Sequence, residues 1–323
     1  MELVLTPDNP VPAGAIVSPV RTGDGLTLRV ARWHPAGVAR GTVLVAQGRA
    51  EFIEKYFETA ADLLARGFVV VTFDWRGQGL STRELRNPFK GHIDDFLLYE
   101  RDLDAVIEQV LAPFAPKPWF ALGHSTGATI LLEAARRGRS PFERTVLLAP
   151  LIDIKNLPAP KGVRLLADGL NLLGLGGAYI PGGGGRSIFT RPFKGNRLSS
   201  DPRRYARNAA IVTHAPRLGV GDPTIGWVHA AFRRIDELAD PAYAPSVAKP
   251  ILVIAAGADR IVSTPAIERF SARLKAGSLI VLDKSGHEIL QERDAIRERF
   301  WAAFDAFVPG MREEEVLADR APV

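Results

Sequence analysis

A serine lies between two glycines at the point where an apolar run gives way to a helical pattern. The pentapeptide GHSTG, residues 123–127, follows the apolar run 119–122 and precedes the helical pattern of residues 128–136. A serine on such a sharp strand-to-helix turn is strained, with its hydroxyl exposed, and flanking glycines avoid collisions with neighbouring elements. The positive end of the following helix favours negative charge nearby. We therefore expect Ser125 to be a nucleophile.

A serine hydroxyl needs a base at neutral pH, and the base needs a carboxylate that orients it. Asp259 follows the apolar run 251–254, and His287 follows the apolar run 279–282. Loops that leave the carboxyl ends of parallel strands meet at one edge of a sheet. Because a serine turn of this type takes its acid and then its histidine further along the chain, we predict a catalytic triad of Ser125, Asp259 and His287.

Two other carboxylates compete with Asp259 for the role of the acid. Asp283 closes an apolar run, and Glu288 is adjacent to His287, a position from which the far ring nitrogen is awkward to reach. The other five histidines show no metal-binding spacing such as H-E-x-x-H, and the chain contains no cysteine. We expect neither a catalytic metal nor a cofactor.

The tetrahedral intermediate of such a reaction carries a negative oxygen, which needs two preorganised N–H donors. One predicted donor is the backbone N–H of Thr126, directly after the nucleophile. The other is the backbone N–H of Arg49, in the loop that follows the apolar run 42–45, where Gly48 permits a close approach. We therefore predict an oxyanion hole formed by Arg49 and Thr126.

Short apolar runs alternate with helical patterns along most of the chain. This alternation predicts an α/β fold with a mostly parallel central sheet covered by helices on both faces. Residues 15–34 predict a pair of strands around a turn at residues 22–25. The predicted strands of the parallel part contain residues 42–45, 68–71, 119–122, 145–148, 251–254 and 279–282.

The alternation stops after Pro150 and resumes near Lys249, which predicts an inserted cap. The predicted domains are a core of residues 1–150 and 246–310, a cap of residues 151–245, and a C-terminal tail of residues 311–323. The whole chain carries a net charge of +5, and the predicted cap holds 13 lysines and arginines against seven acidic residues. A cationic cap favours peripheral contact with an anionic membrane surface, whereas nothing in the chain is typical of nucleic-acid recognition.

The predicted location is the cytoplasm, with peripheral contact at the inner face of the membrane. No apolar stretch approaches the roughly 18 residues that a membrane-spanning helix needs. The first residues lack the basic-then-apolar order of a signal peptide. The oligomeric state stays open at this point.

Several motifs together resemble those of α/β-hydrolases, and within that superfamily those of bacterial lysophospholipases and monoacylglycerol lipases. The resemblance implies an α/β-hydrolase fold and hydrolysis of an ester in a single-chain lipid through an acyl-enzyme on Ser125. Two departures are Gln47, where relatives often have histidine, and Thr126-Gly127-Ala128, where Met-Gly-Gly is commoner. The motifs are GRAE at 48–51 with Lys55-Tyr56, FDWRGQGLS at 73–81, GHSTG at 123–127, GAD at 257–259 and GHE at 286–288.

Two other functions stay open. Some relatives of this type are serine aminopeptidases, which need a carboxylate near the free amine of the substrate, but the predicted cap is cationic. The second is a non-catalytic binding scaffold. The complete set of Ser125, Asp259 and His287 argues against it.

Overall fold

Within residues 1–310, the part of the chain that the computed structural model describes, eight strands form one sheet in the order β1-β2-β4-β3-β5-β6-β7-β8. The tail predicted at residues 311–323 lies outside this part. Strands β1 and β2 form the predicted hairpin, β2 runs antiparallel to β4, and all other neighbours are parallel. The predicted mostly parallel sheet is thus confirmed. The strands are β1 (Ile16–Arg21), β2 (Thr27–Trp33), β3 (Thr42–Ala46), β4 (Val69–Phe73), β5 (Trp119–His124), β6 (Arg144–Leu148), β7 (Ile251–Ala256) and β8 (Gly277–Leu282).

The middle of the sheet is apolar on both of its faces. Every residue of β3, β4, β5 and β7 is buried, and these strands consist mainly of valine, leucine, isoleucine and phenylalanine. Strands that are buried on both faces show continuous apolar runs instead of alternation. The runs seen in the sequence therefore correspond to the centre of the sheet.

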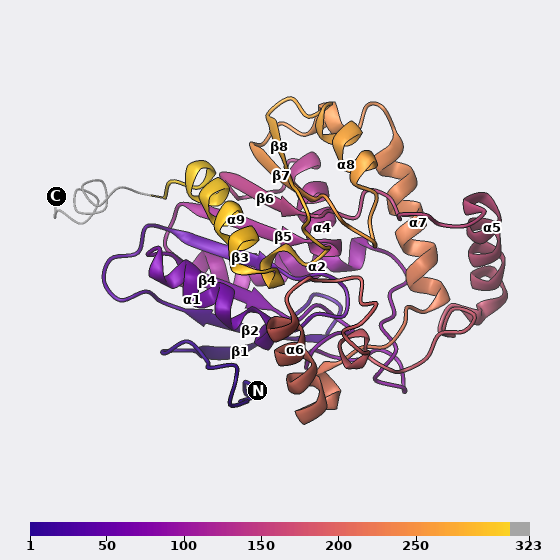
Figure 1. Cartoon of the computed structure of the whole chain (residues 1–323), viewed down its shortest axis with the longest axis horizontal. Coiled ribbons are helices and arrows are strands. Elements are labelled where there is room, and N and C mark those ends of the chain that lie inside the picture. Colours follow the sequence, from indigo (N-terminus) through magenta and orange to yellow (C-terminus); the bar gives the residue numbers. More distant parts are fainter. Residues whose placement is uncertain (311–323) are drawn as a thin grey trace.

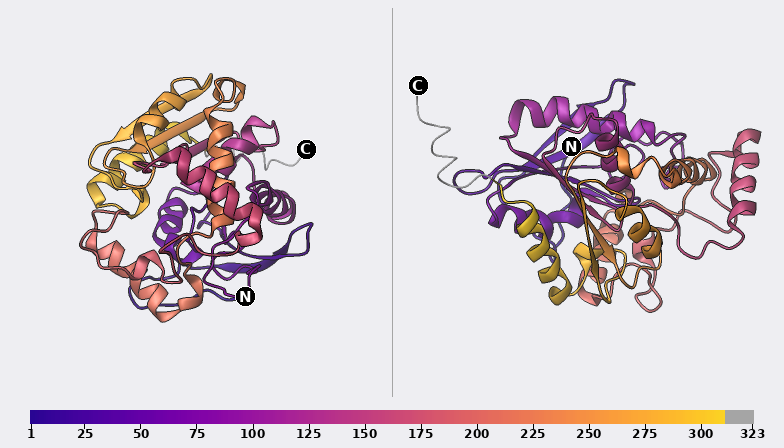
Figure 2. Two further views of the ribbon diagram at one scale, coloured as in Figure 1. Left: turned by 90° about the vertical axis from the view of Figure 1, so that its right-hand side faces the viewer. Right: turned by 90° about the horizontal axis from the view of Figure 1, so that it is seen from above.

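Helices cover both faces of the sheet, as Figures 1 and 2 show. Helix α9 (Asp294–Phe307) lies on one face together with α1 (Phe57–Ala65), and α2 (Leu97–Val106) and α4 (Thr126–Arg136) lie on the other. A short 3₁₀ turn, η1 (Ile53–Tyr56), leads into α1, and a π-helical turn, η2 (Ile107–Leu111), joins α2 to α3 (Ala112–Phe114). Helix α8 (Thr264–Ser271) follows β7.

The chain between β6 and β7 is helical and contains the predicted cap. Its helix α5 stands away from the sheet at one end of the molecule in Figures 1 and 2. The elements are α5 (Pro160–Leu170), the π-helical turn η3 (Asn171–Leu175), the 3₁₀ turns η4 (Ile188–Thr190), η5 (Pro216–Leu218) and η6 (Ala244–Ser246), and the helices α6 (Pro202–His214) and α7 (Ile225–Ala239).

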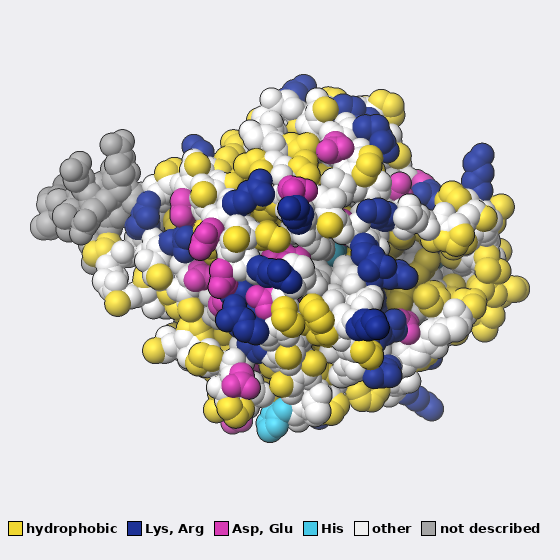
Figure 3. All heavy atoms as spheres, in the orientation of Figure 1, with side chains coloured by type: hydrophobic (Ala, Val, Ile, Leu, Met, Phe, Trp, Pro, Cys, Tyr) yellow, Lys and Arg dark blue, Asp and Glu magenta, His cyan; other side chains and the backbone are white. Residues whose placement is uncertain are grey.

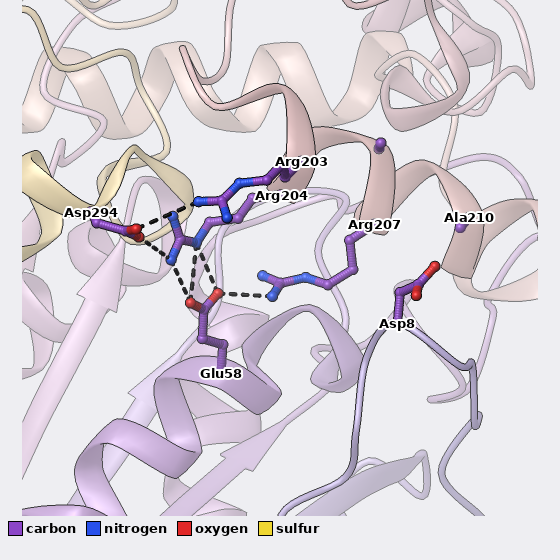
Figure 4. A pocket seen from close by; sticks show the side chains of 8 residues that line it. Asp8, Glu58, Arg203, Arg204, Arg207, Ala210 and Asp294 are labelled. Carbon is purple, nitrogen blue, oxygen red and sulfur yellow. Dashed lines mark hydrogen bonds and ion pairs between the residues drawn. The ribbon is translucent and has the colours of Figure 1, made fainter.

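A polar pocket of about 570 Å³ lies between α6 and the core, close to the start of α9 (Figure 4). Arg204 pairs there with Glu58 of α1 and, at 2.7 Å, with Asp294 of α9. Arg207 pairs with Glu58 at 2.8 Å. Three arginines face three carboxylates in this pocket, so the charges balance and the ion pairs fasten α6 to the core.

Candidate active site

Ser125 occupies the sharp turn between β5 and α4. Its backbone is strained, with a φ of 51° and a ψ of −114°. A Cβ at Gly123 would lie 2.7 Å from the backbone of Ala128, and one at Gly127 would lie 2.3 Å from the carbonyl oxygen of Gln47. These positions exclude any side chain because the obstacle is backbone. The two glycines are therefore needed to fit the turn against α4 and the loop after β3, as the sequence motif predicts.

The structure brings Ser125, His287 and Asp259 together at the carboxyl ends of the parallel strands. His287 Nδ1 lies 2.8 Å from Asp259 Oδ2, and His287 Nε2 lies 3.1 Å from Ser125 Oγ. Because a carboxylate only accepts hydrogen bonds, Nδ1 carries the proton, and Nε2 is free to accept from the serine hydroxyl. All three side chains are buried.

The environment of Asp259 keeps its carboxylate ionised. Burial alone would raise its pKa, but the charge and hydrogen bond of His287 outweigh burial and lower the pKa below the usual value. Its Oδ1 also accepts from the backbone N–H groups of Ile261 and Val262, at 2.7 and 3.0 Å. Asp259 therefore has one oxygen held by backbone and the other available to orient the histidine.

The two competing carboxylates lie elsewhere. Glu288 pairs with the ammonium group of Lys55 at 2.7 Å, and Asp283 is exposed at the end of β8. Of Asp259, Asp283 and Glu288, only Asp259 forms a hydrogen bond with the ring of His287.

The two N–H groups predicted for the oxyanion hole have no acceptor within residues 1–310. Neither Arg49 nor Thr126 donates its backbone N–H to a protein atom there. The residues around Arg49 are held: Gln78 accepts from the N–H of Ala50 at 2.5 Å and donates to the carbonyl oxygen of Gly48 at 3.2 Å. Both N–H groups thus lack a protein acceptor within the described part of the chain.

A buried cluster of charged side chains lies next to the turn that carries Ser125. Glu51 accepts from Lys55 Nζ at 2.5 Å, from the hydroxyl of Tyr56 at 2.6 Å, and from the backbone N–H of Gly48. Burial alone would raise the pKa of Glu51, but the charges of His124 and Lys55 lower it well below the usual value. Lys55 and His124 balance Glu51 and Glu288 in charge, which makes burial of all four tolerable.

His124 connects this cluster to His287. Its Nδ1 lies 2.9 Å from Glu51 Oε1, and its Nε2 lies 3.1 Å from the backbone oxygen of His287. Both contacts are acceptors, so both ring nitrogens carry protons and the ring is an imidazolium. Burial lowers the pKa of His124, yet the neighbouring Glu51 outweighs burial and raises it above the usual value.

Reasoning from the sequence did not assign roles to these residues. The sequence motifs contain Glu51, Lys55 and Tyr56 without indicating what these residues do. His124 is the variable position of the serine motif. The available signal was the Glu51–Lys55 spacing of four residues, which places opposite charges on one side of a helical turn.

The segment between β6 and β7 contacts each loop of the site. Lys155 Nζ donates to the carbonyl oxygen of Asp259. The backbone N–H of Glu288, next to His287, donates to Leu198 O at 2.8 Å. Arg49 Nη2 donates to Gly221 O at 2.8 Å. This segment therefore contacts the loops of Asp259, His287 and Arg49.

Among residues 1–310, no group of three or more histidine, aspartate or glutamate side chains is arranged to hold a metal ion. In the same part of the chain, no helix combines the length and the apolar character needed to cross a bilayer.

The fold and the arrangement of the site define an α/β-hydrolase. The family model described as "Serine aminopeptidase, S33" matches residues 37–294, and the chain belongs to this family. The predicted fold and the predicted hydrolase class are thereby confirmed.

Comparisons with individual proteins confirm the predicted resemblance to lysophospholipases and monoacylglycerol lipases. The chain is 31% identical to the probable lysophospholipase L2 of Haemophilus influenzae, over 85% of this chain and 86% of the relative. It is 30% identical to lysophospholipase L2 of Escherichia coli strain K12, over 85% and 82% of the two chains. The crystal structure of a soluble variant of the monoglyceride lipase from Saccharomyces cerevisiae superposes with a TM-score of 0.74, at 19% identity, over 92% of this chain and 97% of that one. The last similarity concerns the fold.

Proposed function

We propose that this protein hydrolyses the carboxylic ester of a single-chain glycerolipid through an acyl-enzyme on Ser125. The observation that carries the proposal is the line of hydrogen bonds from Asp259 through His287 to Ser125, next to two N–H groups without an acceptor in the described part of the chain. The names of the relatives, lysophospholipase L2 and monoglyceride lipase, support this substrate class.

The first half of the proposed reaction forms the acyl-enzyme. Ser125 Oγ attacks the ester carbonyl carbon while its proton passes to His287 Nε2. The carbonyl oxygen becomes an anion and accepts hydrogen bonds from the N–H groups of Arg49 and Thr126. As the intermediate collapses, the bond to the alkoxy oxygen breaks, and His287 gives its proton to the departing glycerol-containing alcohol.

The second half releases the acyl chain. Water attacks the acyl carbon and gives a proton to His287 Nε2, and the same two N–H groups hold the second oxyanion. The bond to Ser125 Oγ then breaks, the serine recovers its proton from His287, and the fatty acid leaves. Asp259 stays ionised throughout and stabilises the imidazolium that forms in each half.

The serine aminopeptidase alternative requires a carboxylate at the free amine of a substrate. The side chain that extends from the oxyanion loop is instead the guanidinium of Arg49, which would repel an amine. The family's description includes aminopeptidases, so the alternative is included in the experiment below. The complete site argues against a non-catalytic scaffold.

We further propose that residues 1–150 and 246–310 form the catalytic core and that residues 151–245 form a cap over the site. The contacts of this segment with the loops of Asp259, His287 and Arg49 support that division.

The outer side of the proposed cap carries a surface of exposed leucines, here called the leucine surface. It lies on α5 and η3, and Figure 3 shows apolar side chains gathered at that end of the molecule. Leucines this exposed on one element mark an interaction surface. Its members are Leu165, Leu166, Leu172, Leu173 and Leu175, with exposed fractions of 72, 53, 89, 75 and 46%.

The proposed occupant of the leucine surface is an anionic lipid bilayer. The apolar side chains would enter the acyl region while basic side chains of the same segment contact the headgroups. The cap carries an excess of basic residues over acidic ones, which matches a negative surface. The exposed basic side chains of the segment include Lys161, Arg186, Arg191, Lys194 and Arg197.

Labelling with a fluorophosphonate tests the nucleophile. Ser125 is expected to react in the wild type, and labelling is expected to disappear in Ser125→Ala. A panel of lysophospholipids, monoacylglycerols, simple acyl esters and aminoacyl amides then tests the substrate class. Turnover of the lipid esters supports the proposal, whereas exclusive turnover of aminoacyl amides refutes it in favour of the aminopeptidase.

A further inference from the structure

The side chain of Arg49 runs from the oxyanion loop to the cap and ends there without a carboxylate. Its Nη2 donates to Gly221 O at 2.8 Å, and its Cζ lies 5.2 Å from the ring centroid of Trp227 on α7. A Cβ at Gly91 would lie 3.2 Å from the same Nη2, so a glycine on that side leaves room for the guanidinium. Within residues 1–310, Arg49 Nε is buried and has no hydrogen-bond partner.

The buried arginines of residues 1–310 are all neutralised, whereas half-buried Arg49 is not. Each fully buried arginine forms an ion pair with at least one carboxylate; these are Arg29, Arg76, Arg204, Arg234 and Arg297. Four other half-buried arginines of residues 1–310 also pair with no carboxylate: Arg32, Arg83, Arg144 and Arg273. Arg83 and Arg144 donate to backbone carbonyl oxygens, and Arg32 and Arg273 lie over phenylalanine rings. Arg49 differs from these four in its place on the predicted oxyanion loop.

Arg49 therefore holds a positive charge without a neutralising partner among the described residues. Burial lowers the pKa of its guanidinium to about 10, which still leaves it protonated at neutral pH. The nearby carboxylate of Asp222 pairs with Arg191 at 2.8 Å instead. A partly desolvated cation with free donor capacity is stabilised by an anion that can accept two hydrogen bonds.

We propose that the Arg49 guanidinium is a subsite for the phosphodiester of a lysophospholipid headgroup. The inference rests on the proposed ester hydrolysis, because the same residue then contacts the substrate twice. Its backbone N–H holds the ester oxyanion, and its side chain reaches the phosphodiester. The glycerol unit that separates these two groups in a lysophospholipid is similar in length to an arginine side chain. A monoacylglycerol has no anion to offer at this position.

The test compares two substrates with the same acyl chain, 1-octanoyl lysophosphatidylcholine and 1-octanoylglycerol, both as monomers, so that surface charge plays no part. The quantity measured is the ratio of kcat/KM for the phospholipid to kcat/KM for the glyceride. Arg49→Met keeps the length and the backbone N–H but removes the charge, and the ratio is expected to fall about 10- to 100-fold. Arg49→Lys keeps the charge without the planar fork and is expected to recover part of the loss.

The matched control is Arg233→Met, which removes one positive charge from the exposed side of α7. Arg233 is not among the residues that contact Arg49, so the ratio is expected to stay unchanged. An unchanged ratio in Arg49→Met, with thermal unfolding like that of the wild type, overturns the subsite. If the Met variant is misfolded, Arg49→Lys decides, because a lysine without any loss in the ratio contradicts the bidentate subsite.

A binding measurement separates failure of the subsite from failure of the proposed function. Two proteins are titrated calorimetrically with 1-octanoyl lysophosphatidylcholine: the Ser125→Ala variant and the double variant Ser125→Ala, Arg49→Met. If the wild type hydrolyses neither ester, the proposed function fails, yet the subsite is still supported by binding that Arg49→Met abolishes. Binding that is absent, or equal in both proteins, overturns the subsite.

Discussion

His124 holds the backbone of His287: its Nε2 donates to the carbonyl oxygen of His287 over 3.1 Å, and the two rings lie with their centroids 4.8 Å apart. The residue directly before Ser125 thus holds the backbone of His287, the proposed base for this serine. Glu51, which holds the other nitrogen of His124, also accepts from the N–H of Gly48 in the oxyanion loop. One carboxylate is therefore connected, directly or through His124, to the serine turn, the loop of His287 and the loop of Arg49.

Glu51→Gln is expected to lower kcat about 10- to 100-fold with little change in KM, because the loop carrying Arg49 and the base lose a shared anchor. The measurement is steady-state kinetics on a soluble short-chain ester. Asp102→Asn is the matched control, since Asp102 is a buried carboxylate that pairs with Arg76 outside the site. An equal fall in kcat for both variants would show general destabilisation instead.

The pH dependence of this variant gives a second readout. The pKa of His124 is raised in the folded protein above its ordinary value near 6.5. The hydrogen bonds of its imidazolium therefore stabilise the site fully below pH 6.5, and this stabilisation is lost as the pH rises through the raised pKa. Activity is therefore expected to decline on the alkaline side. In Glu51→Gln the anion that raises the pKa is gone, so the decline is expected at lower pH. An alkaline limb at the same pH in both proteins would contradict this role.

Gly127→Ala is expected to reduce kcat at least about 100-fold or to prevent folding. The new methyl group would lie 2.3 Å from the carbonyl oxygen of Gln47 and 2.4 Å from that of Ala46, so the oxyanion loop must move away. Removal of one oxyanion donor has an effect of this size in other hydrolases. Gly169→Ala in α5 is the control, because nothing lies within 4 Å of the added atom there. Wild-type kcat in Gly127→Ala would refute the argument.

The sequence could point to candidate site residues only where a reactive side chain stands in a loop that directly follows a predicted strand. Ser125, Asp259 and His287 each follow an apolar run that ends in a glycine-containing loop, and parallel strands bring such loops together wherever the helices lie. His124 and Glu51 carry no such signal. Their contact joins residues 73 positions apart, and it depends on the exact approach of the turn after β5 to the loop after β3. The lack of a carboxylate at Arg49 likewise depends on where the cap places its charges, which no local pattern encodes.

Asp259→Asn is expected to lower kcat about 10⁴-fold while the protein still folds. An amide donates as well as accepts, so it stabilises the tautomer of His287 with the proton on Nε2, where it cannot take the serine proton. Fluorophosphonate labelling of Ser125 is expected to slow in parallel, which distinguishes a defect in activation from one in substrate binding. Asp283→Asn, at the exposed competitor, is the control and should behave as the wild type. A strong effect in Asp283→Asn with none in Asp259→Asn would reverse the assignment of the acid.

The double variant Leu172→Ser, Leu173→Ser is expected to weaken binding to vesicles of phosphatidylglycerol at least about tenfold. Each leucine that enters the acyl region stabilises the bound state by roughly 1–3 kcal/mol, and serine forfeits this contribution. Co-sedimentation measures the partition. Leu5→Ser, which changes a leucine that is 69% exposed and lies outside the cap, is the control. Binding is also expected to weaken at high salt and on phosphatidylcholine vesicles. Equal partition of all three proteins would refute the leucine surface as the docking site.

Glu58→Gln is expected to destabilise the protein at neutral pH by roughly 2–3 kcal/mol, through the ion pairs between α1 and α6. Burial raises the pKa of Glu58, but the hydrogen bond from Arg204 and the charges of Arg297 and Arg207 lower it to about 2. Since the folded pKa lies below the ordinary value of 4.5, this contribution is complete above pH 4.5 and disappears as the pH falls towards 2. The partial exposure of the carboxylate places the effect at the lower end of that range.

Urea unfolding of the wild type and Glu58→Gln at pH 7, 4.5 and 3 therefore gives free energies of unfolding that converge as the pH falls. Asp8→Asn supplies the control in the same pocket, because Asp8 contacts none of the arginines drawn in Figure 4. A difference between wild type and Glu58→Gln that stays constant over this range would mean that the glutamate acts through packing. A difference that converges identifies the ion pairs as the link that holds α6, and with it one side of the proposed cap, against the core.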